Sequence, residues 1–322
     1  MIISKTPFRV SMFGGSTDYE SFYSSYGSLL IGFGIDKYTY LSLRKTPRIL
    51  NYKSRISYSQ IEIVNNNRDI QHNGVRGVLE HLGIKYGIEL DHLSDLPAQT
   101  GIGSSSSFIV GLLNSIYKLK KTPISRYDLA KEAIQVERFV LKEAGGIQDQ
   151  IWASYGGLNS IHISKNGEFE VKPLPVSENF KRDFVDRSVL IYTGKTRQSF
   201  EIAKAHNSKS NDETKKEILR ISEQAYEAFK SSDLDSVAHL LHLGWENKKK
   251  ISPLVSPKNI NDMYNELLAN GVIGGKLLGT GGSGFIFGIL KEGISKKNFS
   301  KRYSKKCVKF SFDEEGSQII NS

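Results

Sequence analysis

The sequence predicts an α+β fold with two coupled parts, on three observations. The chain has 322 residues, whereas a single hydrophobic core stops growing at roughly 250–300 residues. Segments rich in β-branched and aromatic residues occur together with segments whose apolar residues recur at helical spacing. Prolines and charged residues cluster near residues 175–187, which favours a boundary there. We therefore expect one part over residues 1–185 and another over residues 186–322.

The first part should open with strands and continue with helices. Residues 31–35 and 38–43 carry β-branched and aromatic side chains, as strands do. A long helix should follow the serine run Ser104–Ser107, whose hydroxyls can cap its first turn. A second helix has the capping box Ser125–Asp128 and should end at Gly145–Gly146. The first helix is indicated by apolar residues at helical spacing, namely Ile109, Leu112, Leu113, Ile116 and Leu119.

The rest of the chain should contain strands on both sides of a helical region. Strands are expected around residues 158–163 and 188–192, and helices from about residue 198 to residue 270. A strand, a glycine-rich loop and another strand should occupy residues 274–290, and a last strand residues 308–312. This order gives an α+β fold rather than a regular alternation of strands and helices.

Composition narrows the classes of function. The chain contains no run of about 18 apolar residues, so no membrane span is expected. Residues 1–5 lack the features of a signal peptide, and Cys307 is the only cysteine, which together favour a reducing cytoplasm. The net charge of +10 suits an anionic ligand or nucleic acid, but solvated surface lysines explain it more simply. The basic stretch 296–309 lacks an RNA-binding pattern, so no nucleic-acid partner is expected.

The most specific motif is the loop at residues 96–107, which opens directly into the first predicted helix. Gly101 and Gly103 let the backbone approach a ligand, and the free N–H groups at a helix start favour a phosphate. Serine hydroxyls can also bind Mg²⁺. A helix cap without a ligand is the simpler alternative, but four consecutive serines exceed what capping requires. The loop is not a Walker A motif, because Ser104 stands where the lysine belongs.

A second glycine-rich segment spans residues 276–285. Gly279, Gly281 and Gly284 satisfy the pattern G-x-G-x-x-G, but a dinucleotide-binding fingerprint must open a helix. Here a predicted strand follows at residues 285–290, so we reject that interpretation. A tight hairpin turn is the simpler alternative. We favour a second wall of the same ligand site.

Two further segments present carboxylates. Asp149 follows the double glycine at residues 145–146, and Glu137 lies earlier, among apolar helical neighbours. A buried carboxylate needs a partner, which a metal ion or a salt bridge to Arg138 or Lys142 would provide. From the residue alone, the salt bridge or simple exposure is favoured. Near the N-terminus, a predicted strand bearing Arg9 leads into a Gly-Gly turn that presents Asp18.

Carboxylates such as Asp18 are good acceptors for sugar hydroxyls, although a surface turn capped by Asp18 is the alternative. Together these segments resemble the GHMP kinases, a superfamily that includes galactokinase, homoserine kinase, mevalonate kinase and phosphomevalonate kinase. Residues 7–18, 97–107 and 276–284 are similar to its three motifs and occur in the same order. Residues 146–150 are similar to the segment that carries the catalytic aspartate.

Residues 13–18 lack the Glu-His pair of galactokinases. Their Gly-Gly form resembles the branch that contains D-glycero-D-manno-heptose 7-phosphate kinase and bacterial fucokinase. Residues 96–98, 103–108, 111–113 and 192–197 look closest to the heptose kinases. Ser16 departs from that branch, which usually has glycine at this position.

The resemblance implies a ribosomal-protein-S5-like N-terminal domain, a ferredoxin-like C-terminal domain, and ATP bound in the cleft between them. It implies that Asp149 accepts or orients the proton of the attacking hydroxyl, that Arg9 stabilises developing charge, and that Mg²⁺ is held by Ser105 and Glu137. The expected ATP-binding residues are Pro97, Gly101, Ile102, Gly103, Ser104, Ser105, Ser106 and Ser107. The expected substrate-binding residues are Gly15, Ser16, Thr17, Asp18, Thr193, Gly194, Arg197, Gly281 and Gly282.

The segment Thr193–Arg197 follows a predicted strand and combines a glycine, hydroxyls, a lysine and an arginine. Because such a junction can cradle an anion, we expect it to bind the substrate's phosphate. A capped helix start with solvated side chains is the alternative.

The expected reaction is phosphorylation of heptose 7-phosphate at C1, giving the 1,7-bisphosphate for GDP-heptose and thus for capsule or lipopolysaccharide. A fucokinase- or galactokinase-like enzyme acting on an unphosphorylated sugar remains open. A non-catalytic sugar-binding regulator also remains, although the intact Ser105, Glu137 and Asp149 argue against it. The sequence fixes neither the exact sugar nor the anomer of the product, and it leaves the oligomeric state open, a homodimer included.

Overall fold

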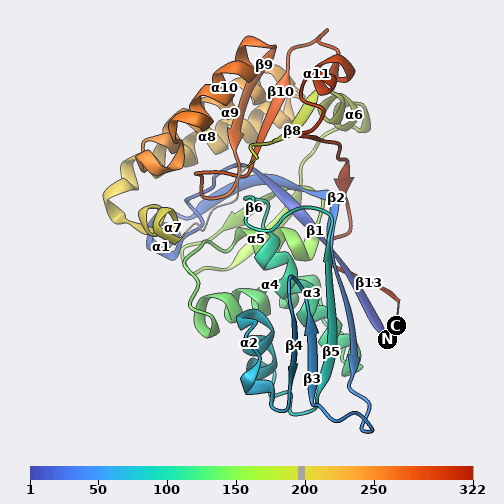
Figure 1. Ribbon diagram of the computed structural model, residues 1–322. Helices are drawn as coiled ribbons and strands as arrows, with labels where there is room; N and C mark the ends of the chain where they lie inside the picture. The colour runs from blue at the N-terminus through green and yellow to red at the C-terminus, as the bar shows by residue number, and fades with distance from the viewer. Residues whose placement is uncertain (195–199, 322) are drawn as a thin grey trace.

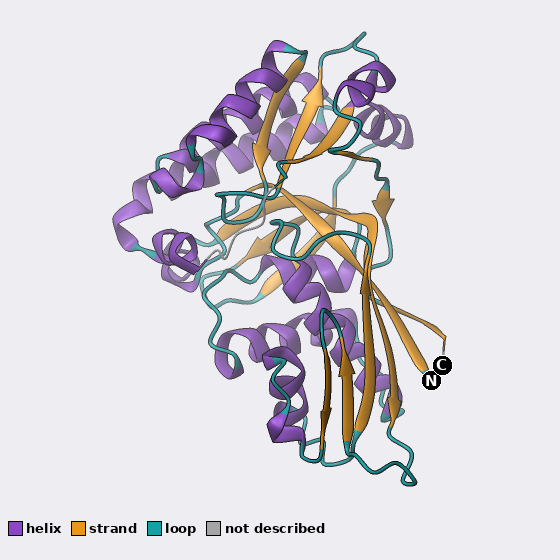
Figure 2. Ribbon diagram, viewed as in Figure 1, coloured by secondary structure: helices purple, strands orange, loops and turns teal. Residues whose placement is uncertain are grey.

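Figure 1 shows the computed structural model, which describes residues 1–194 and 200–321. Two sheets form the framework, and helices cover both of them (Figure 2). The predicted mixture of strands and helices in an α+β fold is therefore confirmed. Within the described ranges, no helix is both long and apolar enough to cross a membrane.

The larger sheet is built around one long strand, β2 (Ser28–Lys45), which pairs with β1 (Ile2–Phe13) along most of its length. The two strands predicted at residues 31–35 and 38–43 are thus one strand. Its continuity comes from a bulge: Pro7 lies opposite Tyr38 while Phe8 lies opposite Ile35. A bulge absorbs extra residues without ending the ladder. The other strands of this sheet in the described residues are β3 (Ser54–Ser57), β4 (Ile61–Val64), β5 (Ile88–Ser94), β6 (Leu158–Ile163), β7 (Phe169–Pro173), β12 (Phe312–Asp313) and β13 (Gln318–Asn321).

The end of the chain returns to this first sheet. A single strand was predicted over residues 308–312, but the structure has two short ones, β11 (Cys307–Val308) and β12. Strand β11 pairs in the second sheet, whereas β12 pairs with β2 and β13 pairs with β1. The expected second part, residues 186–322, therefore gives its last strands to the first sheet. The division at residue 185 stays a proposal, and it falls inside helix α6 (Glu178–Arg187).

Helices α3 (Ser104–Leu119) and α5 (Gln148–Tyr155) pack against β1, and their first turns lie beside Arg9 of that strand. The helix predicted to run to Gly145–Gly146 ends earlier. Helix α4 (Arg126–Gln135) passes into a π-helical turn (Val136–Val140), and Lys142 then has a φ of +54°, which stops it. The remaining helices of this part are α1 (Glu20–Tyr26) and α2 (Asn73–His81).

The second sheet has the strand order β11, β8, β10, β9 in the described residues, with β8 (Ser188–Tyr192), β9 (Val272–Leu277) and β10 (Phe285–Leu290) all antiparallel. Its helices are α6, α7 (Phe200–Asn207), α8 (Asp212–Lys230), α9 (Leu234–Lys249), α10 (Lys258–Ala269) and α11 (Lys296–Arg302).

An aromatic core joins the two sheets. The ring of Phe33 on β2 lies 5.5 Å from that of Phe184 on α6 and 5.6 Å from that of Phe287 on β10. All three rings are fully buried. Because edge-to-face rings pack in a fixed geometry, this core holds the loops of the two parts in a fixed relation, and the site lies among those loops.

Candidate active site

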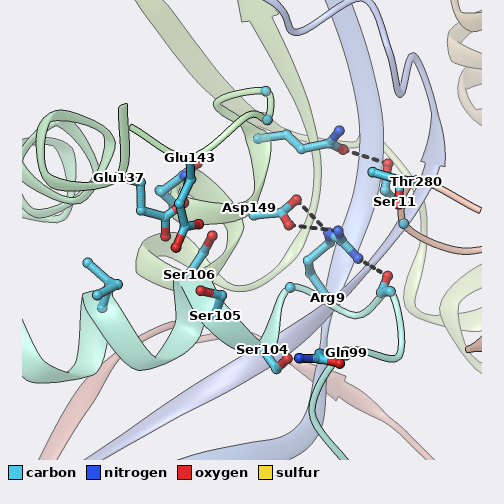
Figure 3. A pocket seen from close by; sticks show the side chains of 18 of the residues that line it. Arg9, Ser11, Gln99, Ser104, Ser105, Ser106, Glu137, Glu143, Asp149 and Thr280 are labelled. Carbon is cyan, nitrogen blue, oxygen red and sulfur yellow. Dashed lines mark hydrogen bonds and ion pairs between the residues drawn. The ribbon is translucent and has the colours of Figure 1, made fainter. Parts of the chain in front are cut away.

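A cavity of about 610 Å³ lies among loops from both parts of the molecule. Its wall includes β1, the turn at residues 14–18, the start of α3, the segment before α5 and the loop between β9 and β10. Figure 3 shows the side chains at its centre. The cavity is large enough for a small ligand of the size that enzymes usually bind.

The two glycine-rich loops are packed backbone against backbone. A Cβ atom on Gly101 would lie 2.6 Å from the carbonyl oxygen of Leu278, and one on Gly284 would lie 2.2 Å from that of Thr100. The N–H of Phe285 donates to the carbonyl of Thr100 at 3.2 Å. Glycine is needed on both loops because only hydrogen fits in these contacts. The structure thus brings together the two loops that the sequence separates widely.

The start of α3 faces the cavity with its first N–H groups. Gly103, at its N-cap, has a φ of +77°, and no side chain in the described residues caps the helix there. The side chains of Ser104, Ser105 and Ser106 line the cavity beside it (Figure 3). Free N–H groups and the helix dipole make such a start suitable for an anion, and hydroxyls add donors.

Arg9 and Asp149 form a two-pronged ion pair in the cavity wall. The Arg9 Nε–Asp149 Oδ1 distance is 2.9 Å and the Nη2–Oδ2 distance is 2.8 Å, while Arg9 Nη1 donates to the carbonyl of Gly101 at 2.6 Å. Asp149 lies in the first turn of α5 and its side chain is 27% exposed. Arginine thus fixes the carboxylate while leaving it lone pairs for a hydroxyl. Gly103 has a φ of +77°, which disfavours larger residues there, and a Cβ would lie 3.3 Å from the Arg9 side chain and 3.4 Å from Asp149 Oδ2.

Glu137 is a buried acid with one unsatisfied oxygen. Its Oε2 accepts hydrogen bonds from Gln150 and from Arg138, the latter at 3.3 Å. Its Oε1 has no hydrogen-bond partner among the residues that the structure describes. Burial, with the charge of Glu143 nearby, raises the pKa of Glu137 to about 8. The salt bridge to Arg138 was the simpler alternative considered from the sequence, and it is present.

The surroundings of Glu137 suit a hard cation. Ser105, Ser106 and Glu143 lie around it in Figure 3, and Glu143 was not anticipated from the sequence. Burial also raises the pKa of Glu143. No group of three or more histidine, cysteine or acidic side chains in the described part of the chain forms a metal site by itself. Mg²⁺ needs no such group, since one or two carboxylates with phosphate oxygens and water suffice.

Asp18 is buried and fully engaged with its neighbours. It accepts from the N–H of Ser16 at 3.2 Å and from Gln148 Nε2 at 3.0 Å. Burial, reinforced by the charge of Asp149, raises the pKa of Asp18. A Cβ atom on Gly146 would lie 1.7 Å from Asp18 Oδ2. The double glycine therefore leaves room for this carboxylate at the cavity wall.

Ser16 adopts a backbone conformation that favours glycine. Its φ is +88°, in the left-handed region, and its hydroxyl compensates by bonding His206 Nδ1 at 2.7 Å. The other ring nitrogen, Nε2, lies 2.9 Å from the carbonyl oxygen of Thr280. Since a carbonyl only accepts, Nε2 carries the proton and Nδ1 accepts from Ser16. Burial lowers the pKa of His206 to about 3, so the ring is neutral.

One end of the cavity is aromatic. His72 stacks on Phe108 with ring centroids 4.7 Å apart, and the edges of His92 and Tyr58 complete the wall. Burial lowers the pKa of His92 to about 4 and also lowers that of His72. Both imidazoles are therefore neutral near pH 7, and this end suits a flat, uncharged ring.

Twelve of the residues expected at the site line this cavity, namely Arg9, Gly15, Ser16, Asp18, Gly101, Gly103, Ser104, Ser105, Ser106, Glu137, Asp149 and Gly281. Others support the wall from behind: Ser107 donates to the carbonyl of Pro7, and Ile102 is fully buried. The expected residues that do not line it are Thr17, Pro97, Ile102, Ser107, Thr193, Gly194 and Gly282. The prediction for Arg197 falls outside the described residues.

Sequence reasoning missed several wall residues, in particular His206, Lys248 and Lys276, together with the aromatic end. Lys276 precedes the second glycine-rich loop, which is the one sequence signal that pointed toward it. His206 and Lys248 lie on helices without a motif, and only the packing of the two parts brings them to the cavity.

Two family models match the chain. Residues 73–157 match the model described as GHMP kinases N terminal domain, and residues 225–309 match GHMP kinases C terminal. The first match ends just beyond α5, and the second contains both strands that flank the second glycine-rich loop.

Individual relatives cover nearly the whole chain. A D-glycero-alpha-D-manno-heptose 7-phosphate kinase from Campylobacter jejuni is 29% identical over 331 residues, covering 98% of this chain and 97% of that protein. A structure titled as a D-glycero-D-manno-heptose 1-phosphate kinase from Bacteroides thetaiotaomicron has a TM-score of 0.82 and 22% identity, covering 100% of this chain and 99% of that one. The galactokinase of Lactococcus lactis has a TM-score of 0.74 and 16% identity, covering 100% and 95%.

Proposed function

This chain belongs to the GHMP kinase family, and on that premise we propose that it phosphorylates the C1 hydroxyl of D-glycero-D-manno-heptose 7-phosphate with ATP, giving the 1,7-bisphosphate. The family makes the chain an ATP-dependent phosphotransferase acting on a hydroxyl. The observation that carries the assignment of the reacting centre is the Arg9–Asp149 pair, which lies against the first glycine-rich loop beside the start of α3.

The shape and chemistry of the cavity support a position for ATP. The aromatic end, with Tyr58, His72, His92 and Phe108, suits the flat nucleobase. The uncapped start of α3 suits the phosphates, which the free N–H groups and the serine hydroxyls can bind. The glycines at 101 and 103 keep side chains out of the space between them. ATP bound in this way would direct its terminal phosphate toward Asp149.

Glu137 and Ser105 would hold Mg²⁺, with Glu143 close by. The unsatisfied Oε1 of Glu137 supports this assignment, since a buried carboxylate oxygen without a donor fits a cation. When bound, Mg²⁺ neutralises phosphate charge. The chain's own groups do the rest: Asp149 orients the attacking hydroxyl and takes its proton, and Arg9 keeps that carboxylate in place.

The choice of sugar rests on the Campylobacter relative, which matches over nearly the whole chain. The turn with Ser16 and Asp18, with Gly281 opposite, is the proposed contact surface for the sugar hydroxyls. The product would enter GDP-heptose synthesis for surface polysaccharide, in the cytoplasm where ATP is available. A fucokinase- or galactokinase-like activity on an unphosphorylated sugar is the alternative outcome of the test.

The test is a panel of acceptors with ATP and Mg²⁺, followed by coupled ADP release. The panel contains D-glycero-D-manno-heptose 7-phosphate, the same heptose without phosphate, L-fucose and D-galactose. We expect the kcat/KM for the heptose 7-phosphate to exceed the others by at least about tenfold, because a charged phosphate adds strong hydrogen bonds. Equal or better turnover of an unphosphorylated sugar would overturn the substrate assignment and leave the kinase assignment intact.

A further inference from the structure

Two buried lysines line the cavity and have no role in the reaction described so far. Lys248 lies near the end of α9 and Lys276 lies in β9, just before the second glycine-rich loop. They are 4% and 5% exposed. Both line the large cavity and also a small hollow behind the turn at residues 14–15. Two elements distant in sequence therefore bring a pair of ammonium groups to one place.

Neither ammonium group has an anionic partner. Lys276 Nζ donates to the carbonyl of Met12 at 3.0 Å, and Lys248 Nζ donates to the carbonyl of Gly279. In the part of the chain that the structure describes, no carboxylate oxygen lies within 4.0 Å of either nitrogen, as the ion pairs found there show. Because an ammonium group has three N–H donors, each lysine keeps donors for a ligand.

The other buried cations among the described residues are paired with carboxylates. Lys215, which is fully buried, lies 3.4 Å from Asp212, and Arg9 is bonded to Asp149. The negative charge of Asp18 acts on both lysines, but this carboxylate already accepts hydrogen bonds from Ser16 and Gln148. His206, beside them, is neutral because burial lowers its pKa to about 3. Positive charge is thus in excess at this end of the cavity.

Such an arrangement is costly in the absence of an anion. Burying a charge without a partner is unfavourable, and two neighbouring like charges oppose each other. Burial lowers the pKa of Lys248 to about 8, and burial together with the charge of Lys248 lowers the pKa of Lys276 well below its usual value. An anion placed between them would relieve both effects.

We propose that Lys248 and Lys276 bind the phosphate group that the sugar substrate itself carries, in place of the segment at residues 193–197. Lys276 contacts the end of β1 just before the turn proposed to hold the sugar, through Met12, and Lys248 contacts the second glycine-rich loop through Gly279. Gly15 leaves the approach open, since even a Cβ there would lie 3.9 Å from Lys276 Nζ. This inference rests on the proposed function, because it assigns a binding site to the phosphate group of the proposed substrate.

The experiment compares Lys248→Met and Lys276→Met with the wild type. We expect kcat/KM for the heptose 7-phosphate to fall on the order of 10- to 100-fold in each variant. The KM for ATP should change by less than about twofold, and any slow turnover of the unphosphorylated heptose should be unaffected. A rise in KM for ATP, or an equal loss with both sugars, would overturn the proposal.

A second measurement separates this site from the choice of sugar and from folding defects. Inorganic phosphate alone should raise the Tm of the wild type, and this rise should be clearly smaller in both lysine variants, which keep only the start of α3 to bind it. Without phosphate, the variants should unfold at the wild-type Tm or above it, because an unpaired buried charge has been removed. The matched control is Lys215→Met, which breaks a buried pair: its Tm should fall, while the phosphate effect remains.

The outcomes distinguish the two proposals. A wild type that accepts no sugar phosphate overturns the proposed substrate, and the anion site then depends on the phosphate effect alone. Stabilisation by phosphate that is the same in the wild type and in both lysine variants overturns the anion site, whichever sugar is used.

Discussion

The two charged regions of the cavity differ in how their charges are balanced. Around Asp149 and Glu137, the cations are bound to carboxylates: Arg9 pairs with Asp149, and Arg138 pairs with Glu137. Around Lys248 and Lys276, the cations have only backbone carbonyls as partners among the described residues. A cavity with one acidic region and one basic region can bind a cation and an anion at separate places. The acidic region suits a metal ion, and the basic region suits an anionic group on the acceptor.

The largest effect is expected at the acidic region, from Asp149→Asn. The amide keeps the shape but cannot take a proton, so kcat should fall about 10²- to 10⁴-fold. Binding of ATP should stay close to that of the wild type, because the proposed nucleotide contacts lie on α3 and at the aromatic end. Steady-state kinetics and a nucleotide titration measure both quantities. A variant with nearly full turnover would show that Asp149 serves only to hold Arg9.

Gly146→Ala tests whether the buried carboxylate of Asp18 packs tightly against the double glycine. The added methyl would lie 1.7 Å from Asp18 Oδ2, and such overpacking typically costs about 1–3 kcal/mol. Thermal unfolding should show the loss. The neighbouring Gly145→Ala is the control, because its methyl meets the end of the long Arg138 side chain, at 2.9 Å, rather than a buried carboxylate at 1.7 Å. Equal stability of the two variants would contradict the packing described for Asp18.

Glu137→Gln removes negative charge from the acidic region. If the unsatisfied Oε1 faces Mg²⁺ during catalysis, the Mg²⁺ concentration for half-maximal activity should rise by about tenfold or more. Activity at saturating Mg²⁺ should recover much of the loss. An Mg²⁺ requirement equal to that of the wild type would contradict a metal site in the acidic region. Glu137 would then be a purely structural acid paired with Arg138.

Glu137 also predicts a pH dependence of stability. Its pKa of about 8 in the folded protein lies above the ordinary 4.5, so the folded state binds the proton more tightly than the unfolded state. This stabilisation is complete below about pH 4.5 and is lost as the pH rises through about 8. Without ligands, the Tm of the wild type should therefore decline over this range more steeply than that of Glu137→Gln. Parallel pH curves would contradict the raised pKa of Glu137.

The smallest effect is expected at the basic region, from Ser16→Gly. Glycine relieves a left-handed backbone that costs roughly 1–2 kcal/mol for other residues, but it removes the hydrogen bond to His206, worth about 1 kcal/mol. The two nearly cancel, so the Tm should change little. Ser16→Ala keeps the strain and loses the bond, and it should be clearly less stable than Ser16→Gly. The reverse order would show that the serine is not strained.

Local patterns predicted much of the fold. The helix that begins at Ser104 and the strands at residues 158–163 and 188–192 were found because each pattern is complete within a few turns or residues. The continuity of β2 could not be predicted, because it depends on a bulge set by the partner strand. The return of β13 to β1 could not be predicted either, since nothing local marks a pairing between the two ends.

The same distinction holds for the site. Glu137 stood out as an acid among apolar helical neighbours, and Asp149 stood out after a double glycine. Lys248 gave no such signal, because it precedes two further lysines, Lys249 and Lys250, at the end of a helix and resembles a surface residue. Only the packing of α9 against β9 buries it. Sequence motifs therefore do not identify functional residues whose role depends on burial in the folded protein.

The pairing of β13 with β1 has a consequence for biosynthesis. Ile3 lies opposite Asn321, and the hydroxyl of Thr6 meets that of Ser317 at 2.8 Å. During translation, β1 emerges from the ribosome long before β13, and the edge of β1 that pairs with β13 stays open until residues 318–321 are made. An unpaired strand edge invites association with other chains. The nascent chain therefore carries an exposed edge until residues 318–321 are made, and the strand that closes this edge also completes the sheet bearing Arg9.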